Sequence, residues 1–307
     1  MPQVNFGGFQ PAIASMADVN SYAVAAWSFT GHGFNQVSFI GVMTSKGGAD
    51  SFGQPYIIQT GGAVPGQGGL SLAYLPVQGQ PHGRLFLVYC RDQVVISELK
   101  LATDGSGNVS VVGIVQSKTL YQVTSMYRPG LSFMGNQLVL ALAKDYNAGY
   151  KLVVSISNDV VATPNDLTFN TAADLSDSSD AGPGLAIVPG PGPQIWLTWK
   201  GQGNTDINIA MYDSSANDIY NKITISNSTI TSPELTYCNG QLYLTFIGTA
   251  PNVNIWPQAD WGKVNPRVLP DVAREVSICP SVDAQSLMLA WIISTEGPNL
   301  IVSNEAA

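Results

Sequence analysis

A short apolar segment recurs six times along the chain, and this repeat constrains the fold more than any other feature. The clearest copies lie at 194–201, 241–248 and 286–291, and weaker copies lie at 22–31, 84–89 and 137–142. The last position of the shared core falls at Trp27, Tyr89, Leu142, Trp199, Phe246 and Trp291, so successive units are 45 to 62 residues long. Repeats of this period are typical of solenoids, propellers and related arrays.

Further elements recur in phase with this core. A proline lies upstream in most units, usually after a Ser or Thr, at Pro11, Pro129, Pro183, Pro233 and Pro280. A β-like run follows the core in each unit, at 37–42, 94–99, 152–156, 207–211, 253–256 and 300–302. A more variable run comes next, for example at 56–58, 109–115 and 222–225. Four strands per unit without a helical period predict an all-β, six-bladed β-propeller with four antiparallel strands per blade.

The two ends of the sequence predict how the ring closes. The sixth unit runs out after its third strand, near Asn304, and a spare strand-like segment lies at 3–6. An N-terminal strand that completes the last blade would cover a sheet edge that soluble proteins avoid exposing. We therefore expect residues 1–307 to form a single propeller domain.

The charge composition excludes several partners. The chain carries 13 Lys and Arg against 21 Asp and Glu, for a net charge of −8. Such a surface does not neutralise phosphates, which argues against nucleic acid and against anionic membranes. No apolar stretch approaches the roughly 20 residues that span a bilayer. The first residues lack the basic and apolar regions of a signal peptide, which indicates a cytoplasmic protein or one released by a non-classical route.

No metal or cofactor is predicted. Cys90, Cys238 and Cys279 are odd in number and lie in β-rich runs, so we expect buried thiols in a reducing compartment. The histidines, His32 and His82, have no Cys, His or Glu close by in the sequence. The acidic run 174–180 has a spacing that would suit Ca²⁺, but a solvated loop between blades explains it better.

The repeat resembles that of sialidase-like β-propellers, in their lectin-like branch. The resemblance rests on the order of a Ser or Thr turn, a proline, the apolar core and an Asn-containing third strand, and 179–213 is the clearest copy. The Asp-box that sialidases carry between the third and fourth strands has only degenerate counterparts here, at 45–52, 157–169 and 212–218.

The resemblance implies a carbohydrate ligand and leaves catalysis open. Sialidases hold the substrate carboxylate with three arginines, whereas this chain has five arginines in all and no Phe/Tyr-Arg-Ile-Pro motif near its start. We therefore expect a non-catalytic, multivalent lectin that binds glycans or glycoconjugates. The alternatives are a sialidase-like glycoside hydrolase and a protein-interaction scaffold or toxin subunit, and an oligomer remains open.

Candidate ligand-binding residues follow from propeller geometry. Loops after the second strand and loops that enter the first strand open on one face, and a neutral sugar needs hydrogen-bonding groups beside an apolar ring face. Aromatic residues at the end of the core pack between blades or serve as sugar platforms. The candidates are His32, Asn35, Arg91, Asp92, Tyr127, Arg128, Asp145, Tyr146, Trp199, Lys200, Asn204, Asp206, Asn252 and Glu296.

Overall fold

A computed structural model describes most of the chain. The described residues are 3–4, 8–16, 22–30, 38–47, 52–60, 69–90, 93–120, 125, 127–146, 149–170, 173–226, 229–293 and 299–307. No helix in these ranges is long and apolar enough to cross a membrane.

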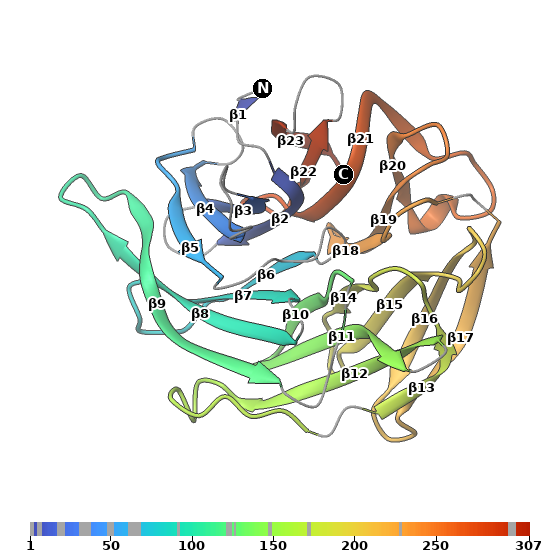
Figure 1. Cartoon of the computed structure of the whole chain (residues 1–307), viewed down its shortest axis with the longest axis horizontal. Coiled ribbons are helices and arrows are strands. Elements are labelled where there is room, and N and C mark those ends of the chain that lie inside the picture. Colours follow the sequence, from blue (N-terminus) through green and yellow to red (C-terminus); the bar gives the residue numbers. More distant parts are fainter. Residues whose placement is uncertain are drawn as a thin grey trace.

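The strands form six antiparallel blades around a central axis, as predicted (Figure 1). Blade 1 contains β2 (Gly8–Met16), β3 (Tyr22–Thr30), β4 (Ser38–Lys46) and β5 (Tyr56–Gln59), and blade 2 contains β6 (Leu70–Leu75), β7 (Arg84–Cys90), β8 (Val94–Thr103) and β9 (Val109–Leu120). Blade 3 contains β10 (Gly130–Met134), β11 (Gln137–Tyr146), β12 (Gly149–Asp159) and β13 (Ala173–Ser178). Blade 4 contains β14 (Gly184–Val188), β15 (Gln194–Lys200), β16 (Ile207–Asp213) and β17 (Asp218–Ile225).

The last two blades form one continuous seven-stranded sheet. Blade 5 contains β18 (Glu234–Cys238), β19 (Gln241–Ile247), β20 (Asn252–Pro257) and the first part of β21 (Arg267–Pro280), and a short 3-10 helix, η1 (Gln258–Asp260), follows β20. Blade 6 contains the second part of β21, β22 (Ser286–Ile293), β23 (Asn299–Ala306) and β1 (Gln3–Val4). β1 pairs with β23, Gln3 opposite Ile301 and Val4 opposite Leu300, so the predicted closure by the N-terminal strand is confirmed.

One element of the predicted repeat is wrong in blade 6. Pro129, Pro183 and Pro233 lie just before the inner strands of their blades, but Pro280 ends the inner strand and pairs with Leu287. The residue opposite the core aromatic Trp291 is Val276. Val276 therefore takes the position of the upstream proline in blade 6, and β21 continues through it from blade 5 into blade 6.

The hydrophobic core lies between the blades. Among the described residues, the buried apolar side chains form six clusters, each shared by two neighbouring blades. Trp27, Trp199 and Trp291 are the largest fully buried side chains, which supports the packing interpretation of the core aromatics. All three cysteines are buried free thiols, as predicted.

In three blades, a Ser or Thr hydroxyl group stabilises the turn that leads into the inner strand. Its oxygen accepts the N–H two residues later and donates to the carbonyl at the end of the second strand. The donors and carbonyls are Ser125 and Ala143 (2.9 Å), Ser179 and Lys200 (2.7 Å), and Thr229 and Ile247 (3.1 Å). This contact explains why Ser or Thr recurs upstream of the proline in the sequence.

The acidic run 174–180 is mostly strand rather than the predicted loop. Residues up to Ser178 belong to β13, the outer strand of blade 3. Asp174, Asp177 and Asp180 each pair with a different lysine, respectively Lys144, Lys222 and Lys200. No group of three metal-ligating side chains occurs among the described residues, and the lysines account for these carboxylates.

Candidate functional site

Several predicted site residues gather on one face of blades 3 and 4. We call Tyr127, Asp145, Tyr150, Asp180 and Lys200 the blade 3–4 face. The rings of Tyr127 and Tyr150 meet edge to face, 4.8 Å apart at 80°. Asp180 pairs with the Lys200 ammonium group and accepts the N–H of Gly203 at 3.0 Å.

The environment of Tyr127 keeps its hydroxyl group protonated. Burial, the Tyr150 hydroxyl and the negative charges of Asp180 and Asp145 raise the pKa of Tyr127 to about 12. The phenol is therefore a hydrogen-bond donor at neutral pH. Both rings are half-buried and Asp145 is exposed, so this face offers an aromatic edge beside carboxylates.

Other predicted residues hold the fold together. Trp199 is completely buried, so its ring face is closed to solvent. The Asn252 amide donates to the carbonyls of Leu269 and Pro270, both at 3.2 Å. Asn204 is exposed and its side chain accepts the N–H of half-buried Asp206 at 2.9 Å.

The remaining candidates lie partly or wholly outside the described residues. Tyr146 ends β11 opposite Gly149, but its side chain is not described. His32, Asn35, Arg91, Asp92 and Glu296 lie outside the described residues altogether.

Arg128, also predicted as a ligand-binding residue, is a brace across the propeller axis. It is 2% exposed and starts from the entry to blade 3. Its guanidinium group donates to the carbonyls of Leu70 in blade 2 (3.1 Å) and Val276 in blade 6 (2.5 Å). It also bonds Ser277 at 2.9 Å and pairs with Glu234 of blade 5 at 2.8 Å. Arg128 thus joins four blades at one end of the axis.

A cavity of about 390 Å³ follows the axis from this brace. Ser71, Ser132 and Thr236 contribute hydroxyl groups to it, among apolar side chains of the inner strands. Beside the brace, burial raises the pKa of Glu234, and Arg128 opposes that effect. Burial also raises the pKa of Glu275 to about 7, with Arg128 lowering it and Glu234 raising it further.

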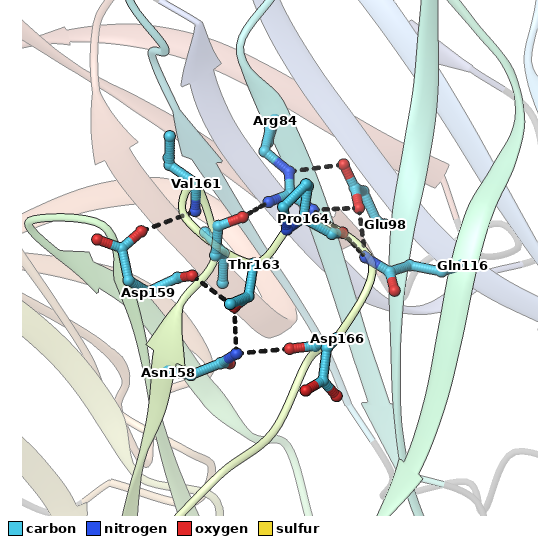
Figure 2. A network of polar contacts seen from close by, with 10 residues as sticks. Arg84, Glu98, Gln116, Asn158, Asp159, Val161, Thr163, Pro164 and Asp166 are labelled. Atoms are coloured by element: carbon cyan, nitrogen blue, oxygen red, sulfur yellow. Dashed lines mark hydrogen bonds and ion pairs between the residues drawn. The ribbon is translucent and has the colours of Figure 1, made fainter.

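A second cavity, of about 360 Å³, lies between blades 2 and 3, and we call it the blade 2–3 cavity. Its floor is an ion pair in which Arg84 binds Glu98 through two parallel contacts, Nε to Oε1 at 2.7 Å and Nη2 to Oε2 at 2.5 Å. Figure 2 shows the Gln116 amide reaching the same carboxylate, with Nε2 2.8 Å from Oε2. His82 and Lys100 also line the cavity.

Sequence reasoning missed the Arg84–Glu98 pair, although strand alternation contained a signal for it. Glu98 shares a strand face with Val94 and Ile96, and Arg84 shares one with Phe86 and Val88; all four apolar residues pack against blade 3. Glu98 and Arg84 therefore both point toward blade 3. A charged side chain in such an apolar interface must pair with an opposite charge or stay in contact with water. The pairing of Arg84 with Glu98 can be inferred only when the strand register is known, in which Phe86 lies opposite Glu98.

Comparison with known proteins identifies the fold. No protein-family model matches the chain, and no curated protein matches its sequence. AofleA from Arthrobotrys oligospora has a similar structure, with a TM-score of 0.62 at 9% identity over 100% of this chain and 90% of that one. Aleuria aurantia lectin in complex with alpha-methyl-L-fucoside gives a TM-score of 0.59 at 11% identity over 99% and 97% of the two chains.

A sialidase shares the fold as well. Trypanosoma rangeli sialidase in complex with sialic acid has a TM-score of 0.60 at 12% identity. The match covers 99% of this chain but 56% of the sialidase, so this chain spans about half of that protein. Identities this low show a shared propeller architecture, and function must be argued from the site.

The described arginines do not form the three-arginine clamp that a sialidase resemblance implies. Arg84 pairs with Glu98 and Arg128 pairs with Glu234. Arg267 pairs with Glu305 at 3.3 Å and is 44% exposed. These three arginines each have a carboxylate partner in a different part of the ring, and the fourth described arginine, Arg274, is exposed.

Proposed function

We propose that this protein is a non-catalytic carbohydrate-binding protein and that it holds a neutral sugar in the blade 2–3 cavity. The observation that carries the proposal is a fixed set of polar atoms, in which Arg84 and Glu98 line the cavity and Gln116 bonds the same carboxylate. Arg84 Nη2 and Gln116 Nε2 are donors, and Glu98 Oε2 is an acceptor within 2.5 to 2.8 Å of both. A sugar hydroxyl both donates and accepts, so it matches such a set.

The remaining lining suits the carbon skeleton of a sugar. Val115 and half-buried Val161 line the cavity beside the polar floor. Small-molecule sites usually combine a mostly apolar lining with a few precisely oriented polar groups, and their volumes start near 300 Å³. The architecture shared with Aleuria aurantia lectin, which was solved with a fucoside, supports the same class of function.

The blade 3–4 face is proposed as a second contact for the same glycan class. Tyr127 supplies an aromatic edge and a donor, and Asp145 an exposed acceptor. Lys200, Asn204 and Asp206 follow at the rim of blade 4. Two sites on one rigid ring would raise the avidity for a glycan-bearing surface without new contacts at either site.

A glycan array followed by calorimetric titration tests the proposal. We expect the wild-type chain to bind a neutral glycan and Arg84→Lys to bind it about tenfold more weakly or worse, because Lys cannot keep two parallel bonds to Glu98. Arg267→Lys is the matched control, since Arg267 forms an exposed ion pair. Thermal melts of both variants separate lost binding from lost folding. An array with no bound glycan contradicts the proposal.

A glycoside hydrolase is the second candidate, because Glu234 lines the axial cavity and its charge acts on the nearby Glu275 carboxyl. A carboxylic acid with a pKa near 7 suits a general acid. However, Oε2 of Glu275 is buried without a hydrogen-bond partner among the described residues, and Arg128 occupies Glu234. We expect purified protein to release no chromophore from aryl glycosides. Release that disappears in Glu275→Gln would favour the hydrolase.

A further inference from the structure

Residues 159–166 of blade 3, which we call the strap, cross from the end of β12 to the blade 2–3 cavity (Figure 2). Their blade 3 side is firmly held. The Asp159 carboxylate accepts the N–H groups of Val161 and Ala162 at 2.9 and 2.8 Å. The Asn158 amide donates to the Thr163 hydroxyl and to the Asp166 carbonyl, both at 2.5 Å.

On the blade 2 side the strap covers the cavity floor through two carbonyl groups. The Val160 carbonyl accepts from Arg84 Nη1, and the Pro164 carbonyl accepts from Arg84 Nη2 at 3.0 Å. Gln116 Nε2 donates to the Pro164 carbonyl at 2.7 Å. These contacts account for every guanidinium nitrogen of Arg84.

The Pro164 carbonyl therefore stands where the proposed sugar hydroxyl would stand. It accepts from the two donors, Arg84 and Gln116, that also bind Glu98 Oε2. A carbonyl oxygen only accepts, so it makes no bond to the Glu98 carboxylate. A hydroxyl group in the same place would accept from both donors, and its own hydrogen could be donated to a further acceptor.

The two halves of the strap differ in how firmly they are packed. Val160 is 1% exposed and belongs to the cluster between blades 2 and 3. Residues 162–166 are exposed. Within this exposed half, the Pro164 carbonyl makes the hydrogen bonds to blade 2, so this half can leave while Val160 stays packed.

We propose that residues 162–166 are an internal competitor for the glycan, and that binding exchanges the Pro164 carbonyl for a ligand hydroxyl on Arg84 and Gln116. This inference rests on the proposed function. The ligand it selects is a sugar that presents a free hydroxyl to the cavity floor. A deoxy position there would leave Arg84 Nη2 and Gln116 Nε2 without the acceptor that the Pro164 carbonyl supplies.

Competition by the strap predicts that a looser strap binds glycan more tightly. The apparent dissociation constant is the intrinsic one divided by the fraction of molecules with an open site. Asn158→Ala removes the two bonds to the strap and the bond from the Thr168 N–H to Asn158 Oδ1, so the closed arrangement loses population. We expect Asn158→Ala to lower the dissociation constant about threefold or more. Asn170→Ala is the matched control, because that side chain bonds Ile156 and does not touch the strap.

The experiment combines titration with amide hydrogen exchange, using methyl α-L-fucoside and the best glycan from the array as probes. The strap amides of Ala162, Thr163 and Asp166 should exchange faster when the probe is bound, whereas a ligand bound over a closed strap would slow them. Binding by wild type with slower strap exchange and unchanged affinity in Asn158→Ala overturns the strap inference alone. Absence of binding by wild type and by Asn158→Ala overturns the proposed function.

Discussion

Replacement of Arg128 by methionine tests whether this side chain is a structural brace. Met has a similar length, but it removes the bonds to the Leu70 and Val276 carbonyls and to Ser277, and leaves Glu234 buried without its partner. Breaking a buried ion pair from one side costs about 3 to 5 kcal/mol. For a chain of this size, we expect the melting temperature to fall by roughly 10 °C.

Thermal melts followed by far-UV circular dichroism measure this loss, and a double-mutant cycle assigns it. Glu234→Gln removes the charge that Arg128→Met strands, so the double variant should be more stable than the two single costs predict by about 1 kcal/mol or more. Arg267→Met is the control, because exposed ion pairs contribute about 1 kcal/mol at most. Equal melting temperatures for Arg128→Met and Arg267→Met would refute the brace.

Two further predictions concern the centre of the ring. Glu275 has a raised pKa, so its contribution to stability is complete below its ordinary pKa of 4.5 and is lost as the pH rises to about 7. Urea unfolding at about pH 5 and about pH 8 should show up to about 3 kcal/mol more loss in wild type than in Glu275→Gln, and equal losses would contradict this origin. In Gly182→Ala, the new Cβ would lie 2.1 Å from the Arg128 carbonyl oxygen. We expect a cost of about 2 kcal/mol in thermal melts, whereas Gly190→Ala, which meets nothing within 4 Å, should melt like wild type.

The repeat alone predicted the architecture because each blade contains the same sequence elements in the same order. The apolar core, the turn hydroxyl and the proline recur in register, and a blade cannot bury its faces without neighbours. Closure by the N-terminal strand was also predictable, since blade 6 lacked a fourth strand in the sequence. The exception is β21, where the sequence offered a misleading proline at 280 and the true counterpart of Pro233 is Val276.

The candidate sites were predictable only in part. Position along the blades brought Tyr127, Asp145 and Lys200 to one face, because Asp145 and Lys200 lie at the ends of β11 and β15 and Tyr127 lies in the loop before β10. Arg128 lies in such a loop too, but its long side chain turns inward to partners 58 and 148 residues away in sequence. The Arg84–Glu98 pair and the strap depend on contacts between blades. The sequence pattern of a single repeat unit carries no information about such contacts.

The most direct test of sugar binding in the blade 2–3 cavity is a crystal structure of the protein soaked with the glycan that the array selects. We expect electron density for a sugar in the blade 2–3 cavity, with one hydroxyl bonded to Arg84 and Gln116 and the Pro164 carbonyl moved away. A sugar bound in the axial cavity, with Arg84 still capped by Pro164, would contradict it.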